Sequence, residues 1–92
     1  MAQPGLNLKR VSFVARVEKA KSVSVTGDFT GWSAEGISLV QGPRGNWHTG
    51  FTLAPGEYQY RLRVDNQWRD HVQAEKHVRN SIGYENCVLV VR

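Results

Sequence analysis

Two kinds of side chain in this sequence could bind a ligand: a row of long polar residues and a tryptophan close to them. Within residues 55–68, apolar side chains occupy every second position, and Gln59, Arg61 and Arg63 lie between them. Because successive side chains of a strand point to opposite faces, these three are predicted to share one exposed face. Trp68 closes the stretch, just after a turn at Asp65 and Asn66. A flat indole beside hydrogen-bond donors is the combination with which proteins bind sugars.

No arrangement of residues is typical of a catalytic centre. The sequence has no Gly-x-Ser-x-Gly nucleophile elbow and no Gly-x-x-x-x-Gly-Lys phosphate loop. Glycoside hydrolysis requires two carboxylates that flank a cleft, whereas a β-sandwich of this size offers a surface. We therefore predict a protein that is not an enzyme and uses no cofactor.

The spacing of histidine and cysteine also predicts no metal site. His48, His71 and His77 are the only histidines, and no pair has the i, i+4 or Cys-x-x-Cys spacing of common metal sites. His71, His77 and Cys87 could meet only through the fold. The single cysteine cannot form an internal disulfide, and residues 1–10 lack the apolar core of a signal peptide, so we expect a cytoplasmic protein.

Length and composition indicate one small domain. The chain has 92 residues, of which 40% are hydrophobic and 22% charged. No apolar run approaches the roughly 18 residues of a membrane span, so no membrane association is expected. Pro4 and Gly5 favour a loose tail over residues 1–8, with the domain over residues 9–92.

The net charge of +4 makes nucleic acid a partner to consider, because its phosphates attract basic proteins. Five basic residues crowd the first quarter of the chain, but the others are interleaved with acidic residues and form no dense block. This distribution is typical of a solvated surface and argues against nucleic acid.

Alternating apolar residues predict strands at 11–17, 22–26, 47–53, 58–64 and 86–91, and a short one at 37–40. Residues 54–56 are predicted to close a hairpin between the third and fourth of these, and residues 69–85 show no pattern. The expected fold is an all-β, immunoglobulin-like antiparallel sandwich of about seven strands. The predicted core comprises Phe13, Val25, Trp47, Phe51, Tyr60, Leu62 and Leu89.

The three tryptophans are predicted to have different roles. Trp47 shares the apolar side of its strand and is assigned to the core. Trp32 and Trp68 each follow a turn beside polar or glycine neighbours, where a loop would hold them. Either they cover the ends of the sandwich, or they form an exposed binding platform.

Three motifs resemble a known family in their order and spacing. They are residues 25–32 (VTGDFTGW), 56–68 (GEYQYRLRVDNQW) and 80–86 (NSIGYEN). Together they resemble the family 48 carbohydrate-binding modules, the early-set domains of glycogen and starch debranching and branching enzymes of glycoside hydrolase family 13. The glycogen-binding domain of the AMP-activated protein kinase β subunit is a member. The whole chain is similar to a standalone bacterial isoamylase early-set protein.

This resemblance implies a surface that binds α-1,4-glucans such as glycogen, starch or maltooligosaccharides. The implied binding residues are Trp32, Arg61, Trp68, Ile82, Tyr84 and Asn86, with the two tryptophans stacking on glucose rings. The chain departs from the family pattern at Thr30, Arg61, His71 and Tyr84, where asparagine, lysine, proline and threonine are usual. The alternative is a protein-docking early-set domain that has lost sugar binding and associates with a glycan-processing enzyme.

Overall fold

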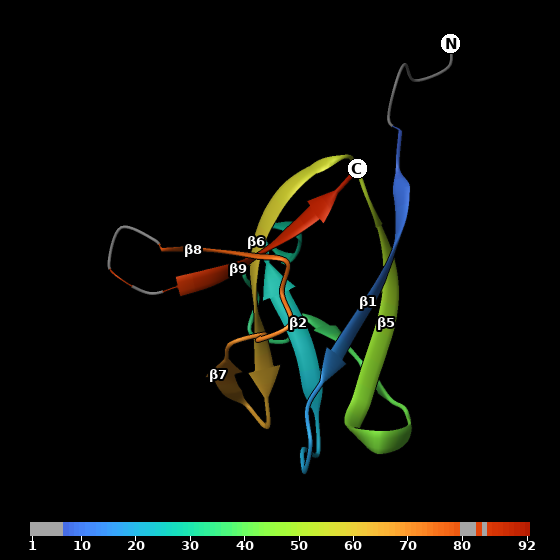
Figure 1. Cartoon of the computed structure of the whole chain (residues 1–92), viewed down its shortest axis with the longest axis vertical. Helices are drawn as coiled ribbons and strands as arrows, with labels where there is room; N and C mark the ends of the chain where they lie inside the picture. Colours follow the sequence, from blue (N-terminus) through green and yellow to red (C-terminus); the bar gives the residue numbers. More distant parts are fainter. Residues whose placement is uncertain (1–6, 80–82, 84) are drawn as a thin grey trace.

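The computed structural model describes residues 7–79, 83 and 85–92 and consists of two antiparallel β-sheets packed as a sandwich (Figure 1). A three-stranded sheet has the order β1-β5-β4, and a six-stranded sheet has the order β3-β2-β6-β9-β8, with β7 paired to β6. The elements are β1 (Lys9–Arg16), β2 (Val23–Gly27), η1 (Asp28–Thr30), β3 (Ile37–Ser38), β4 (Val40–Gln41), η2 (Pro43–Gly45), β5 (Asn46–Leu53), β6 (Gly56–Val64), β7 (Gln67–Arg69), β8 (Lys76–Arg79) and β9 (Glu85–Val91).

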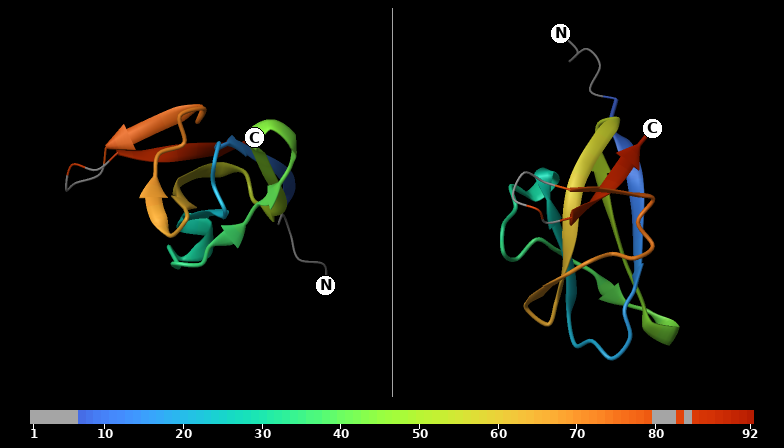
Figure 2. Two further views of the ribbon diagram at one scale, coloured as in Figure 1. Left: turned by 90° about the horizontal axis from the view of Figure 1, so that it is seen from below. Right: turned by 60° about the vertical axis from the view of Figure 1, so that its left-hand side comes forward.

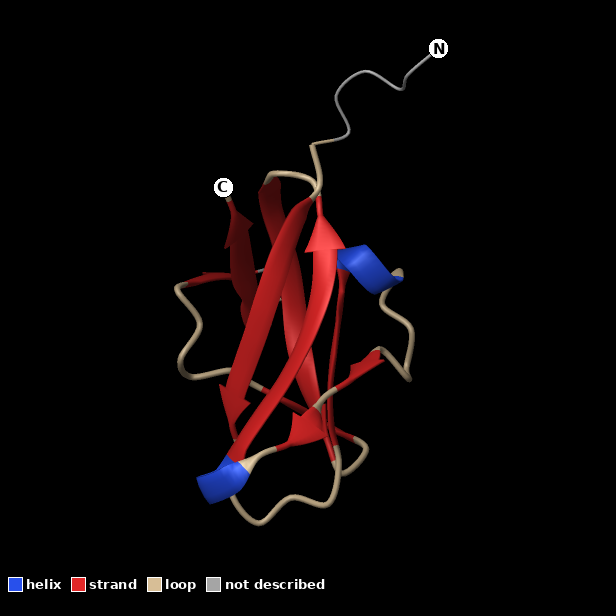
Figure 3. Cartoon of the chain, turned by 90° about the vertical axis from the view of Figure 1, so that its right-hand side faces the viewer, coloured by secondary structure: helices blue, strands red, loops and turns tan. Residues whose placement is uncertain are grey.

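The helices η1 and η2 are single 3₁₀ turns at opposite ends of the sandwich (Figure 3). Within the described ranges no longer helix is present, which confirms the prediction of an all-β fold for that part of the chain. None of the described helices is long and apolar enough to span a membrane.

The alternation of side chains decides which face of each long strand is buried. In β1, and in β6 from Tyr58 onward, every second residue is buried or half-buried. β1 exposes the residues between them, whereas β6 leaves Gln59, Arg61 and Arg63 half-buried. The buried core contains Phe13, Ala15, Val23, Val25, Leu39, Trp47, Tyr60, Leu62, Val64 and Cys87. Phe51 and Leu89 are only partly buried but pack against this cluster. The predicted core is thus confirmed, with those two residues at its margin.

Trp47 is a core residue, as predicted. Its side chain is 4% exposed, and its indole nitrogen donates a hydrogen bond to the carbonyl oxygen of Val17 at 3.0 Å. In the same core cluster, Phe13 meets Tyr60 edge-to-face with ring centroids 5.3 Å apart. A buried indole whose only polar atom is hydrogen-bonded stabilises the core without leaving an unsatisfied donor.

The predicted strand at residues 37–40 is wrong in one respect, because it is two strands in different sheets. β3 pairs with β2, and β4 pairs with β5. Between them the side chain of Leu39 is 6% exposed, and its backbone N–H donates to the carbonyl oxygen of Val23 at 2.9 Å. The chain crosses between the two sheets at this buried leucine.

The predicted hairpin at residues 54–56 is also wrong. β5 pairs with β1 and β4, whereas β6 pairs with β2, β9 and β7. The tight turn at Ala54 and Pro55 therefore carries the chain from one sheet to the other. Turn residues mark where a strand ends, but they do not say which strand the chain pairs with next.

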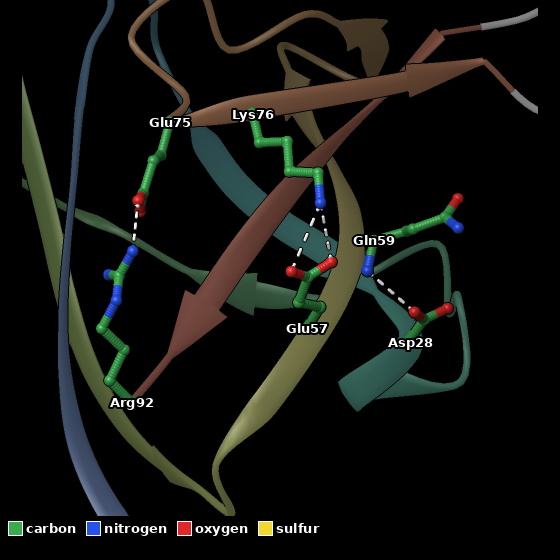
Figure 4. A network of polar contacts seen from close by, with 6 residues as sticks. All are labelled: Asp28, Glu57, Gln59, Glu75, Lys76 and Arg92. Atoms are coloured by element: carbon green, nitrogen blue, oxygen red, sulfur yellow. Dashed lines mark hydrogen bonds and ion pairs between the residues drawn. The ribbon is translucent and has the colours of Figure 1, made fainter.

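Residues 69–85, predicted to have no regular structure, contain the end of β7 and the strand β8. β8 lies beside β9 at one edge of the larger sheet (Figure 2). The Nζ atom of Lys76 on β8 lies 3.1 Å from Oε1 of Glu57 on β6, and Arg92 pairs with Glu75 at 2.7 Å (Figure 4). A four-residue strand with half-exposed side chains is too short to show a period-2 pattern.

Candidate binding surface

Two tryptophans that are far apart in sequence lie next to each other on the outer side of the larger sheet. The ring centroids of Trp32 and Trp68 are 6.4 Å apart, with 49° between the ring planes. The side chains are 37% and 43% exposed. Both indoles lie outside the buried core and are partly exposed, and we call this pair the aromatic platform.

Trp32 is held by the loop that begins with η1. The backbone at Gly31 and at Trp32 is left-handed, with φ values of 64° and 58°. Non-glycine residues rarely adopt this conformation, and it persists where the surroundings enforce it. Here the backbone N–H of Trp32 donates to the carbonyl oxygen of Gly27 at 3.0 Å, and the indole nitrogen donates to Oδ1 of Asp28 at 3.0 Å.

Asp28 links this loop to the larger sheet. While Oδ1 accepts the indole N–H, Oδ2 accepts the backbone N–H of Gln59 on β6 at 2.8 Å (Figure 4). One carboxylate therefore fixes the position of Trp32 relative to β6, the strand that carries the polar row of Gln59, Arg61 and Arg63.

Thr30, one of the departures from the family pattern, stabilises the same loop. Its hydroxyl oxygen accepts the backbone N–H of Gly27 at 3.0 Å and lies 2.8 Å from the hydroxyl of Thr26. Thr26 is fully buried, and its hydroxyl donates to the carbonyl oxygen of Ser33 at 2.6 Å. These contacts show how threonine maintains the shape of the loop that presents Trp32.

Trp68 lies on a strand, and the prediction of a loop position is wrong. β7 follows β6 through the two-residue turn Asp65-Asn66, in which both residues have positive φ values, as a type I′ hairpin requires. Oδ1 of Asp65 accepts the backbone N–H groups of Lys21 and Ser22 at 2.8 and 2.9 Å. These hydrogen bonds, with that of Ser22 the larger contribution, lower the pKa of the Asp65 carboxyl.

Arg63 is the residue in contact with the Trp68 ring. The two residues are cross-strand partners, and the guanidinium carbon lies 4.9 Å from the ring centroid, within the range of a cation–π interaction. The sequence placed Arg63 on the exposed face but nominated only Arg61 for the site. Its position two residues after Arg61 on the same strand face was the signal that could have identified it.

Arg61 lies on β6 between Gln59 and Arg63, half-buried, and faces Thr26 across the strand pair. Its Nε atom is buried and has no hydrogen-bond partner within the described part of the chain. Asn86 is 8% exposed, and its side-chain amide donates to Oε1 of Gln59 at 3.0 Å. The structure therefore places Arg61 and Asn86 on neighbouring strands, with Asn86 holding a side chain of the polar row.

The predicted site residues Ile82 and Tyr84 lie outside the described residues. They belong to the connection between β8 and β9, so the structure neither supports nor contradicts their assignment.

A shallow depression of about 390 Å³ adjoins the platform at Arg63. Ser24 is the cross-strand partner of both Arg63 and Ser38, and all three line the depression. Glu35 and Asn66 contribute further polar groups to its rim. The surface thus combines two apolar ring faces with hydroxyl, amide, carboxylate and guanidinium groups, which can bind a polar, uncharged ligand that has one apolar face.

Comparison with known proteins agrees with these features. Residues 13–92 match the family described as "Glycogen recognition site of AMP-activated protein kinase". The chain is 31% identical over 90 residues to "Protein PTST homolog 2, chloroplastic" of Arabidopsis thaliana. It is 28% identical over 90 residues to "Protein FLOURY ENDOSPERM 6, chloroplastic" of Oryza sativa subsp. japonica. Each match covers 98% of this chain but only 16% of the relative. The chain therefore belongs to the carbohydrate-binding family of the glycogen recognition site of AMP-activated protein kinase.

Proposed function

We propose that this protein is a non-catalytic module that binds α-1,4-glucans, with glucose rings stacked on Trp32 and Trp68. The observation that carries the proposal is the pair of exposed indoles 6.4 Å apart on one face of the larger sheet. Membership of a glycogen-recognition family supports the same ligand class.

The chemistry of the surface matches the two faces of a pyranose. The C–H face of a glucose ring packs on an indole through apolar burial and dispersion. The hydroxyls at the ring edge require donors and acceptors, which Arg61, Arg63 and Gln59 supply from the outer face of β6. Arginine donates through a planar fork, so one guanidinium can serve two neighbouring hydroxyls.

The tilt between the indoles favours a curved ligand. An α-1,4 linkage turns each glucose ring relative to the one before it, whereas a β-1,4 chain is flat. Two platforms at 49° to each other present their faces in different directions, as successive rings of an α-glucan do. We therefore expect preference for maltooligosaccharides over cellooligosaccharides.

The affinity for a short oligosaccharide should be modest. The platform is open to solvent, so water competes for each hydroxyl, and ordering a flexible ligand costs conformational entropy. We expect a Kd on the order of 10 to 100 µM for maltoheptaose, about 5 to 7 kcal/mol of binding free energy.

The test is an NMR titration with maltoheptaose that follows the three indole N–H signals. Trp32 and Trp68 should shift with ligand concentration, while the buried Trp47 serves as an internal reference that should not. Cellohexaose is the matched ligand control. If neither exposed indole responds to maltoheptaose, the proposed function is wrong.

A second candidate, a protein-docking domain that associates with a glycan-processing enzyme, is favoured by one feature of the smaller sheet. Val14 and Val40 flank His48 in register on its exposed face, and the two valines are 54% and 61% exposed. Exposed apolar side chains grouped on one face are typical of a protein-docking surface. Val14→Asp should then abolish capture of the enzyme without changing the response to maltoheptaose.

A further inference from the structure

Three side chains with metal-binding atoms meet at the edge of the larger sheet where β8 and β9 pair. Asp70 follows β7, His77 lies on β8 and Cys87 on β9. One carboxylate oxygen, one ring nitrogen and the sulfur all lie within 4.8 Å of one another. His77 and Cys87 are direct cross-strand partners, so the strand register itself places them side by side. The spacing of these residues in the sequence gives no sign of this arrangement.

The separations approach those of a tetrahedral metal site. Zinc binds sulfur at about 2.3 Å and nitrogen or oxygen at about 2.0 to 2.2 Å, which sets its ligand atoms about 3.4 to 3.6 Å apart. Oδ1 of Asp70 lies 3.1 Å from Sγ of Cys87 and 3.3 Å from Nε2 of His77. The ring nitrogen of His77 and Sγ of Cys87 lie within 4.8 Å of each other, so movements of up to about 1 Å in the partly exposed Asp70 and His77 side chains would complete the geometry.

One polar atom of this cluster lacks a hydrogen-bond partner among the described residues. Nε2 of His77 is buried, faces the Asp70 carboxylate and makes no hydrogen bond within the described ranges. The Cys87 thiol donates to the same carboxylate oxygen. A cation bound by both Nε2 and the facing carboxylate oxygen, which lie 3.3 Å apart, would give each atom a metal–ligand bond.

Metal ligands in proteins are usually held by further hydrogen bonds, and this cluster has such hydrogen bonds around it. The backbone N–H of His71 points at Sγ of Cys87 across 3.4 Å, a donor that would remain available to a thiolate. The ring of His71 is in turn fixed by the Tyr60 hydroxyl, 2.6 Å from Nδ1. The Asp70 side chain is 45% exposed and Cys87 is fully buried, so an ion could enter from the Asp70 side.

We propose that Asp70, His77 and Cys87 bind a zinc ion, with water as the fourth ligand. The mixed sulfur, nitrogen and oxygen set is one that zinc accepts and that magnesium and calcium do not prefer. A bound ion would join the β7–β8 connection to the β8–β9 hairpin. Because Cys87 binds as a thiolate, uptake of zinc at neutral pH releases its proton to solvent. This site is separate from the glucan platform, and the proposal does not depend on it.

The test uses the full chain, freed of metal with a chelator and titrated with zinc and, as a spectroscopic probe, with cobalt(II). We expect one ion per chain, a rise in Tm with zinc, and the near-ultraviolet thiolate-to-cobalt charge-transfer absorption. Loss of a residue that only hydrogen-bonds to a metal ligand lowers metal affinity about 10- to 100-fold. Loss of a ligand itself should cost at least as much, so Cys87→Ala, His77→Gln and Asp70→Asn should each weaken binding by about 100-fold or more.

His48→Gln is the matched control, since His48 is an exposed histidine on the other sheet. It should leave zinc affinity unchanged. The variants at Asp70 and His77 change side chains that are partly exposed, so they test the site even if Cys87→Ala does not fold. The proposal is overturned if the chain binds no ion at micromolar zinc, if cobalt gives no thiolate absorption, or if binding survives in both His77→Gln and Asp70→Asn.

Discussion

The indole nitrogen of Trp32 donates a hydrogen bond to Oδ1 of Asp28 at 3.0 Å. Because the second oxygen of the same carboxylate accepts the backbone N–H of Gln59, this contact ties a loop tryptophan to the central strand of the larger sheet. The orientation of the Trp32 ring therefore depends on a residue that need not touch the ligand.

Asp28→Ala should lower the affinity for maltoheptaose about tenfold, because about 1.4 kcal/mol of hydrogen bonding that orients the ring is lost. Isothermal titration calorimetry measures this change. Asp28→Asn is the control, since its amide oxygen can still accept the indole N–H. If both variants bind like the wild type, Asp28 does not orient the platform.

Trp68→Ala should abolish glucan binding and leave the fold intact. The residue is 43% exposed and lies outside the buried core, so its truncation removes much less buried area than truncation of a core tryptophan. Thermal unfolding and maltoheptaose titration of the same sample give the two readouts.

Trp47→Ala provides the contrast within the same domain. Its side chain is 4% exposed and its indole nitrogen is hydrogen-bonded to Val17. Truncation of such a core tryptophan costs about 3 to 5 kcal/mol, a large fraction of the stability of a domain this size. Should Trp68→Ala unfold the domain to the same extent, Trp68 is a structural residue.

Glucan binding should change little between low and moderate salt. Glucans are uncharged, whereas contacts to nucleic-acid phosphates release counterions and weaken steeply as salt rises. Maltoheptaose titrations at two ionic strengths, with a DNA oligonucleotide in parallel, measure the difference. Tight, salt-sensitive binding to DNA without a response to maltoheptaose would instead identify a nucleic-acid-binding domain.

Asp65 should make stability depend on pH in the acid range. The backbone N–H groups of Ser22 and Lys21 lower the pKa of its carboxyl in the folded protein below the unfolded value of about 3.9. The stabilisation is therefore present above about pH 4 and is lost as the pH falls through the folded-state pKa.

Asp65→Asn is the matched control, because asparagine also tolerates the positive φ and keeps an acceptor but does not titrate. Thermal unfolding from pH 7 to pH 2 should show the wild type more stable at pH 7, with the difference shrinking below about pH 4. A difference that is constant across this range would mean that the carboxylate charge does not contribute.

The sequence predicted the long strands well because each has one buried face. In β1, β5 and β6 the period-2 pattern follows directly from that burial, and the assignment of Trp47 to the core rests on the same pattern. The exposed tryptophans and the polar row were found for the complementary reason, since neither fits an apolar face.

Strand pairing could not be predicted in the same way. The chain passes from one sheet to the other at Leu39 and again at the turn after Leu53. Both crossings depend on packing between segments that are distant in the sequence. The proximity of His77 and Cys87 likewise follows from the register of β8 on β9, and β8 itself is too short to detect. Arg63 was not predicted as a site residue, because its contact with Trp68 depends on the pairing of β6 with β7.

The crossing of the chain between sheets has a consequence for how fast the protein acquires its structure. β1 pairs with β5, so that Lys9 lies opposite Leu53, and β2 pairs with β6, so that Val23 lies opposite Val64. Each pairing closes a long segment before its contacts form, and loop closure costs entropy that only later contacts offset. Domains with such high contact order fold in about milliseconds to seconds. We expect folding in that range, limited by the search for the β1–β5 and β2–β6 registers.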